Sequence, residues 1–202
     1  MGLYGNIVDG FKKAFETKCV ALLVSAYHTS IAEHIYSPGW MENDFTGMLD
    51  EYIGKNPQRV KWKISCNVEH HLHKKGLEKK KGYANSEDRI DLRLTTFSST
   101  DEYHFFVEAK RLKEKGSGLL SRYINTGIDH YLSKKYPHGV LLGYLIEGNV
   151  DVSIQKINAL LIKGTRTSEM LVRKEHSLHN QYFESTHPGF GVISHFVFDY
   201  TV

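Results

Sequence analysis

The fold of this chain is decided by two short stretches, Arg89-Ile-Asp91-Leu and Phe106-Val-Glu108-Ala-Lys110-Arg-Leu. Apolar and polar residues alternate over 90–94, and 103–107 is aromatic and β-branched, so both stretches are expected in strands. Side chains two residues apart in a strand point to the same side, which places Glu108 and Lys110 together. If the two strands are antiparallel neighbours, with a turn near 98–101, Asp91 comes level with Glu108. The sequence therefore predicts two acids and a lysine at one point of a sheet.

Helical and strand-like patterns surround these two strands. Apolar residues at helical spacing predict helices over 42–53, 119–131 and 150–162, and β-like patterns predict strands at 60–72, 139–146, 170–172, 181–184 and 191–200. A further amphipathic helix is expected near the N-terminus, with an apolar stripe of Val8, Phe11, Phe15, Cys19, Leu22 and Ala26. Three strands in series predict a meander, and a helix between two strands predicts a crossover. The expected fold class is therefore α/β (α+β).

Length and composition narrow the class of protein. With 202 residues, of which 41% are hydrophobic and 24% charged, the chain is expected to form one globular domain over 1–202. The net charge of +3 neither requires nor excludes a nucleic-acid partner. The two cysteines, Cys19 and Cys66, exclude a disulfide scaffold and a CxxC zinc module, and they fit a cytoplasmic protein.

Several common classes find no support in the sequence. No apolar stretch approaches the roughly 20 residues of a membrane-spanning helix, so no membrane partner is expected. The lysines ahead of 19–26 loosely resemble a secretory signal, but the amphipathic stripe through the same residues favours a packed helix. Walker A, GxGxxG and HExxH patterns do not occur, which leaves nucleotide hydrolysis, dinucleotide binding and zincin chemistry without a motif.

The two acids and the lysine suggest metal chemistry. Two carboxylates at one point repel each other unless a cation lies between them, and oxygen ligands favour Mg²⁺, with Mn²⁺ as a substitute, over zinc. The carbonyl of Ala109 is a candidate for a further oxygen ligand. Lys110 could position a water molecule or stabilise charge in the transition state. Hydrolysis of a phosphodiester requires these parts.

The arrangement resembles the PD-(D/E)XK, or restriction-endonuclease-like, nuclease superfamily. The resemblance covers about 40–148, where the expected order of helix, three-strand meander, helix and strand matches the superfamily core. It implies that Asp91 and Glu108 bind the metal and that Lys110 is catalytic. Glu42 matches the glutamate that many members place on the first core helix. The residue before Asp91 is Ile90, where the superfamily's name gives a proline, and this departure is common in the superfamily.

The resemblance divides the chain into three parts and leaves two acidic positions open. An N-terminal helical extension covers 1–38, the core covers 40–148, and a C-terminal helix with extra strands covers 149–202. Glu69 is a candidate for an extra metal ligand or a solvent-facing residue. The helix that carries Glu42 could instead bring Glu51 to the site.

The same residues also have a plain structural interpretation. A strand that ends in Glu-Ala-Lys-Arg can be a solvated edge, and surface Glu–Lys pairs are nearly neutral in energy. Asp91 can simply face water, because it alternates with apolar neighbours.

Basic residues near the expected site predict contact with a nucleic-acid backbone. Five lysines cluster in the loop after the first strand of the meander, and further basic residues follow the Glu108 strand. The alternative for the lysines is a solvated loop without a ligand. The predicted nucleic-acid contacts are Lys74, Lys75, Lys79, Lys80, Lys81, Arg111, Lys113 and Arg122.

Histidines outside this site have other interpretations. His71 and His73 are expected to be cationic strand-end residues or phosphate contacts, and His187 and His195 are structural or border the nucleic-acid site. His71 and His73 have spacing that zinc permits, but no fourth ligand is evident nearby. A pair of Ser185 or another serine with His187 or His195 could be imagined in the tail, but no nucleophile elbow is present and no acid is evident to orient the histidine.

The sequence thus predicts a Mg²⁺-dependent endonuclease that acts on a nucleic acid, DNA by resemblance, in restriction, phage defence or repair. Two alternatives remain open: a non-catalytic nucleic-acid-binding module on the same fold, and an interaction or scaffold protein. A homodimer also remains open, since many such nucleases dimerise to cut both strands.

Overall fold

The fold is mixed α/β and is built on one seven-stranded sheet. A computed structural model describes residues 3–72, 88–98, 101–115, 118–133, 136 and 139–202. The strand order is β1-β2-β3-β4-β7-β6-β5. The strands are β1 (Ile64–Leu72), β2 (Asp88–Phe97), β3 (Glu102–Lys113), β4 (Gly139–Glu147), β5 (Val172–Arg173), β6 (Tyr182–His187) and β7 (Gly191–Asp199). The helices are α1 (Leu3–Glu33), α2 (Glu42–Lys55), α3 (Pro57–Lys61), α4 (Leu119–Arg122), the π-helix η2 (Tyr123–Ile128), α5 (Asp129–Leu132), α6 (Val150–Lys163) and the 3-10 helix η3 (Thr167–Glu169).

The meander and the crossover that the sequence predicts are both confirmed. Strand β2 pairs antiparallel with β1 and with β3, whereas β3, β4 and β7 run parallel. The helices α4, η2 and α5 connect β3 to β4, and the parallel arrangement requires such a crossover. The sheet therefore changes from antiparallel to parallel at β3, which carries Glu108 and Lys110.

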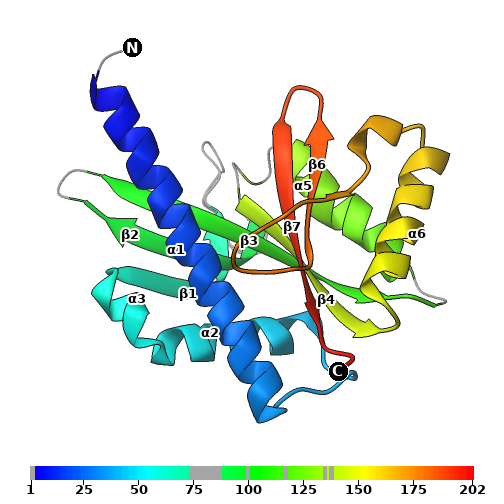
Figure 1. Cartoon of the computed structure of the whole chain (residues 1–202), viewed down its shortest axis with the longest axis horizontal. Coiled ribbons are helices and arrows are strands. Elements are labelled where there is room, and N and C mark those ends of the chain that lie inside the picture. Colours follow the sequence, from blue (N-terminus) through cyan, green and yellow to red (C-terminus); the bar gives the residue numbers. More distant parts are fainter. Residues whose placement is uncertain (1–2, 73–87, 99–100, 116–117, 134–135, 137–138) are drawn as a thin grey trace, which may run out of the picture.

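Apolar cores lie on both faces of the sheet. Side chains of α1 and α2 pack with one face, and side chains of η2, α5 and α6 pack with the other. Figure 1 shows α1 crossing the sheet diagonally, while α5 and α6 group together at the far end of the sheet. Strand β4 contributes to both cores and is buried over 140–146, which agrees with its unbroken apolar sequence.

The N-terminal part of α1 is less buried than its stripe predicts. Val8 and Phe11 are 39% and 42% exposed, and burial of the stripe begins at Phe15. The reason is visible in Figure 1, where this end of α1 extends beyond the sheet.

The first strand of the meander starts later than the sequence pattern suggests. Residues 60–61, predicted to be in the strand, belong to the short helix α3, and Val60 is 66% exposed. The side chain of Asn56 caps this helix by accepting from Gln58 N at 2.9 Å, and Pro57 occupies its first turn. Asn56-Pro57 therefore ends one helix and starts another.

The crossover helix contains a π-helical segment that the sequence did not predict. Its glycine, Gly127, lies on the sheet, where an added Cβ would be 3.0 Å from Leu141 Cδ2. The small residue allows η2 to approach β4 closely. Among the described residues, no helix is long and apolar enough to cross a membrane.

Candidate active site

The candidate site lies where β2 and β3 separate. Antiparallel pairing of the two strands ends at Leu92 and Val107. Beyond that point two carboxylates bind the freed edge of β3: Ala109 N donates to Asp91 Oδ2 at 2.7 Å, and Arg111 N donates to Glu42 Oε2 at 3.1 Å. The acids of β2 and α2 thus replace a neighbouring strand along this part of β3.

The ammonium group of Lys110 lies at the centre of the acids. Lys110 Nζ is 2.6 Å from Glu108 Oε1, 2.6 Å from the carbonyl oxygen of Ala109, 3.2 Å from Glu42 Oε1 and 3.8 Å from Asp91 Oδ2. These side chains are only 5–21% exposed. A buried ammonium is tolerable here because several oxygens compensate for its lost hydration.

Burial and neighbouring charges shift the pKa values of this cluster in different directions. Burial, then the charge of Glu108, raises the pKa of Asp91 to about 7. Burial also acts to raise the pKa of Glu108, but hydrogen bonds and charge from His130 and Lys110 hold it below its usual value. Burial acts to lower the pKa of Lys110, and the charges of Glu108, Asp91 and Glu42 outweigh it, so that this pKa is raised. Shifts of this kind are typical of functional sites, although structural ion-pair networks produce them too.

The structure brings together the residues that the sequence placed at one point. Asp91, Glu108 and Lys110 meet, the Ala109 carbonyl faces Lys110 Nζ, and Glu42 holds Lys110 from α2. Of the two glutamates considered on that helix, Glu42 is the one at the site. Glu51 instead forms an exposed ion pair with Lys55 on the same helix.

Glu69 lies outside the acid cluster. Its place in β1 is between the pairs Val68–Leu92 and His70–Ile90, so it is level with Asp91 across the ladder. However, its backbone φ is +47°, its side chain is exposed, and Asn43 Nδ2 donates to its Oε1 at 2.7 Å. The side chain of Glu69 is therefore held by the first turn of α2.

The predicted nucleic-acid contacts fall into three groups. Lys74, Lys75, Lys79, Lys80 and Lys81 lie outside the described residues. Arg111 donates to the carbonyl of Trp40 at 3.0 Å, and Lys113 pairs with Glu147, so both make contacts within the protein. Arg122 is exposed on α4.

Two residues near Glu108 were missed by sequence analysis. His130 Nδ1 lies 3.8 Å from Glu108 Oε1, and Tyr136 donates to the carbonyl of Arg89 at 2.9 Å. Hydrogen bonding by both side chains lowers the pKa of Glu108. His130 was visible in the sequence as part of the crossover helix, but its direction depends on the π-helical turn before it.

The tail histidines do have an acid to orient them, contrary to expectation. His187 Nδ1 lies 2.6 Å from Glu169 Oε2, and Ser185 Oγ lies between His187 Nε2 and His195 Nε2. The sequence gives no local signal for this acid, because η3 is separated from the β6–β7 hairpin by β5 and a long connection.

The donor set is compatible with Mg²⁺. Among the described residues, no three His, Cys, Asp or Glu side chains form a group that could hold a metal ion. The described residues give no support for zinc at His71, and His73 lies outside the described residues. Mg²⁺, however, is commonly held by one or two carboxylates together with substrate phosphates and water. The carboxylates of Asp91 and Glu108 and the Ala109 carbonyl supply oxygen ligands of that kind.

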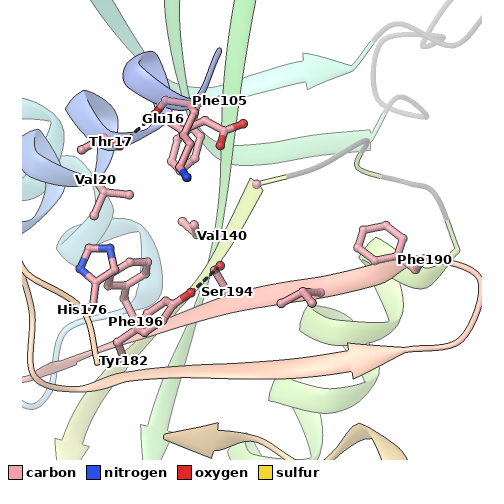
Figure 2. A pocket seen from close by; sticks show the side chains of 13 residues that line it. Glu16, Thr17, Val20, Phe105, Val140, His176, Tyr182, Phe190, Ser194 and Phe196 are labelled. Atoms are coloured by element: carbon pink, nitrogen blue, oxygen red, sulfur yellow. Dashed lines mark hydrogen bonds between the residues drawn. The ribbon is translucent and has the colours of Figure 1, made fainter. Parts of the chain in front are cut away.

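A separate pocket of about 400 Å³ lies on the α1 face of the sheet. Figure 2 shows Thr17 and Val20 on one side of this pocket, with His176, Tyr182 and Phe196 on the other. The hydroxyl groups of Tyr182 and Ser194 bond to each other at 3.1 Å. Glu108 and Lys110 are instead level with Leu141 and Gly143, beneath η2 on the opposite face, so the pocket is separate from the acid cluster.

Comparisons of this chain with protein-family models, with curated proteins and with solved structures gave no match.

Proposed function

We propose that this protein is a Mg²⁺-dependent nuclease with a restriction-endonuclease-like core, and that its substrate is DNA. The observation that carries the proposal is the meeting of Asp91, Glu108 and Lys110, with the Ala109 carbonyl, at the separation of two strands. The core would consist of α2, the meander β1–β3, the α4–η2–α5 crossover and β4.

The roles of the residues follow from their positions. Asp91, Glu108 and the Ala109 carbonyl would hold Mg²⁺, which supplies a Lewis acid and an activated water to phosphodiester hydrolysis. Asp91 and Glu108 need their ionised forms for this role, so metal binding is expected to release protons where Asp91 is still protonated.

Lys110 would then act beside the metal ligands. Its ammonium now contacts the same oxygens that would hold the cation, so some of these contacts must be given up on binding. Glu42, which bonds Lys110 Nζ at 3.2 Å and is anchored to Arg111 N, remains as a partner that keeps the ammonium at the site. From that position the positive charge of Lys110 can stabilise the negative charge that develops on a phosphate.

A cleavage assay tests this proposal. Supercoiled plasmid and labelled single-stranded DNA and RNA are incubated with the protein in Mg²⁺, Mn²⁺ or EDTA. Cleavage is expected only when metal is present. The rate of cleavage is expected to fall at least about 10²-fold in Asp91→Asn, Lys110→Met and Glu42→Gln. Glu51→Gln, which removes an exposed acid of the same helix, is the matched control and should cleave normally.

The outcomes separate the nuclease from its rivals. Full cleavage by Asp91→Asn or Lys110→Met would overturn the site assignment. No cleavage of any substrate, together with salt-dependent DNA binding that EDTA does not change, would favour a binding module. Neither cleavage nor binding would favour an interaction protein.

A further inference from the structure

A continuous chain of hydrogen bonds runs from η3 through the β6–β7 hairpin to η2. Tyr123 Oη lies 2.9 Å from His195 Nδ1, and His195 Nε2 lies 2.7 Å from Ser185 Oγ. Ser185 Oγ lies 2.6 Å from His187 Nε2, and His187 Nδ1 lies 2.6 Å from Glu169 Oε2. The three central side chains are almost fully buried, with exposed fractions of 0–2%.

The protons of this chain have one arrangement that satisfies every atom. Burial, then the charge of His187, lowers the pKa of His195 to about 3, and burial also lowers the pKa of His187. Bonding to Arg166 lowers the pKa of Glu169, which is therefore ionised. His187 then donates from Nδ1 to Glu169 and accepts from the Ser185 hydroxyl.

The remaining two bonds follow from that start. The Ser185 oxygen accepts from His195 Nε2–H, and His195 Nδ1 accepts from the Tyr123 hydroxyl. Each donor has one acceptor, so a break at any position leaves a buried polar atom without its partner.

A further ion pair connects the start of this hydrogen-bond chain, at Glu169, to the C-terminal end of the π-helix. Arg166 binds Glu169 Oε2 at 2.6 Å and also binds Asp129 Oδ1 at 2.8 Å. Tyr123 is the first residue of η2, and Asp129 directly follows its last residue. Both ends of η2 are therefore tied, through side chains, to η3 and the hairpin.

The π-helix in turn packs against the candidate site. A Cβ on Gly127 would lie 3.5 Å from Lys110 Cγ, so η2 directly covers the aliphatic stem of Lys110. The ring of Tyr123 lies against Gly143, which is level with Lys110 in the sheet. His130, one residue after Asp129, is near Glu108. Movement of η2 would therefore be transmitted to Lys110.

A nucleophilic role for Ser185 is disfavoured by its surroundings. The distances among Ser185, His187 and Glu169 are those of a serine–histidine–acid triad. Yet Ser185 is 1% exposed, and its hydroxyl is engaged on both sides, by His187 and by His195. Such a hydroxyl is placed to hold two histidines rather than to attack a substrate.

We propose that Ser185, His187 and His195 are positioning residues that fix η2 on the sheet and thereby hold Lys110 in the candidate active site. The catalytic consequence rests on the proposed function, whereas the structural consequence does not.

The test uses two variants that break the chain and one that does not. Ser185→Ala breaks its centre, and Tyr123→Phe removes only the hydroxyl at its end. Tyr182→Phe is the matched control, because it removes a tyrosine hydroxyl from the same hairpin, on the α1 face, where it bonds to Glu184 and Ser194. The readouts are the ¹H–¹⁵N signal of the Lys110 ammonium, assigned with Lys110→Arg, the amide exchange of 123–128, and kcat and KM for cleavage.

Ser185→Ala and Tyr123→Phe, which break the hydrogen-bond chain, are both expected to shift or broaden the Lys110 signal. Both should also speed amide exchange in 123–128 about tenfold. They should lower kcat at least about tenfold with KM nearly unchanged, while Tyr182→Phe should change none of these. An unchanged Lys110 signal in both variants, or equal changes in Tyr182→Phe, would overturn the proposal. If the parent protein does not cleave, the proposed function fails, and the NMR signal and amide exchange still decide the positioning role.

Discussion

At the scale of single residues, Lys110 matters most for the candidate site, because its ammonium lies within 4 Å of three acids from two strands and a helix. Its replacement by methionine keeps the aliphatic bulk and removes the charge. Loss of one partner from a buried ionic cluster commonly costs about 3–5 kcal/mol, so Lys110→Met is expected to lose stability on that order in EDTA at pH 8.

Added Mg²⁺ should stabilise Lys110→Met more than the parent protein, because the cation would compensate for the missing ammonium. Denaturant unfolding with and without Mg²⁺ measures both effects. An equal response of the two proteins to Mg²⁺ would argue against a metal at these oxygens.

Asp91 gives a pH-dependent prediction. Its pKa rises from 3.8 to about 7 on folding, so the folded protein binds more protons than the unfolded chain between these values. The stability contributed by the protonated form is fully present below pH 4 and is lost as pH rises through about 7. Asp91→Asn keeps a hydrogen-bond acceptor for Ala109 N and removes the buried charge.

The stability of Asp91→Asn relative to the parent is therefore expected to increase between about pH 4 and pH 7. The gain is at most about 4 kcal/mol, since one pKa unit corresponds to about 1.4 kcal/mol. Urea unfolding in EDTA at several pH values measures this difference. A difference that does not change with pH would contradict the raised pKa.

The acids and the lysine could be predicted because strand alternation is a local property. Positions 91, 108 and 110 follow from a period of two and one turn near 98–101. His130 and Tyr136 could not be predicted in the same way. The direction of His130 depends on the phase of a helix that contains a π-turn, and Tyr136 lies beyond the end of α5, outside the helices and strands.

At the scale of elements, close packing of η2 on β4 depends on two glycines, Gly127 and Gly143. A Cβ at Gly143 would lie 2.5 Å from Leu112 Cδ1 and 3.5 Å from the Tyr123 ring. Gly143→Ala is therefore expected to cost about 1–3 kcal/mol, as overpacking of a buried site does. Gly47→Ala is its control.

Gly47 lies on the exposed side of α2, where an added Cβ meets nothing within 4 Å. Alanine there should raise stability by about 0.5–1 kcal/mol, because glycine is a poor helix former. Thermal unfolding of both variants checks the contrast. Equal effects would show that η2 adapts to the added methyl group.

Elements with strong periodic patterns were predicted closely, and short ones were not. The helix α6 follows its apolar spacing and its capping residue, Asn149, and ends before Gly164. The five-residue α3 was missed, because Val60-Lys-Trp-Lys-Ile64 alternates like a strand. The capping by Asn56 and Pro57 prevailed over that pattern.

At the scale of the whole molecule, Tyr200 joins parts that are distant in sequence. Its ring is buried against Tyr27 of α1, Phe45 of α2 and Tyr144 of β4, and its backbone N–H donates to Leu145 O at 2.8 Å. Tyr200→Ala is expected to cost about 3–5 kcal/mol, as loss of a buried aromatic ring does.

Tyr200→Phe should cost about 1 kcal/mol or less, since the hydroxyl makes one long contact with Ser30 at 3.4 Å. Denaturant midpoints of the two variants test this. A small effect of Tyr200→Ala would show that the C-terminal segment does not help to hold α1 on the sheet.

The global arrangement was only partly predictable. A meander followed by a crossover could be inferred from the order of elements and the rarity of other connections. The position of the β6–β7 hairpin beside β4, with β7 parallel to it, could not. That placement depends on long-range packing around residues such as Tyr200 and on the hydrogen-bond chain from Glu169 to Tyr123.

The separation of β2 from β3 also bears on self-association. The freed part of β3 has no neighbouring strand to accept from its backbone N–H groups, and a strand of a second chain can add to an edge of this kind. Asp91 and Glu42 occupy its N–H groups at Ala109 and Arg111 and place negative charge along it. Two carboxylates of the candidate site thus also disfavour pairing of this part of β3 with a strand of another molecule. Alanine at either position would leave one of these N–H groups without its acceptor, and such a variant is expected to aggregate more readily than its asparagine or glutamine counterpart.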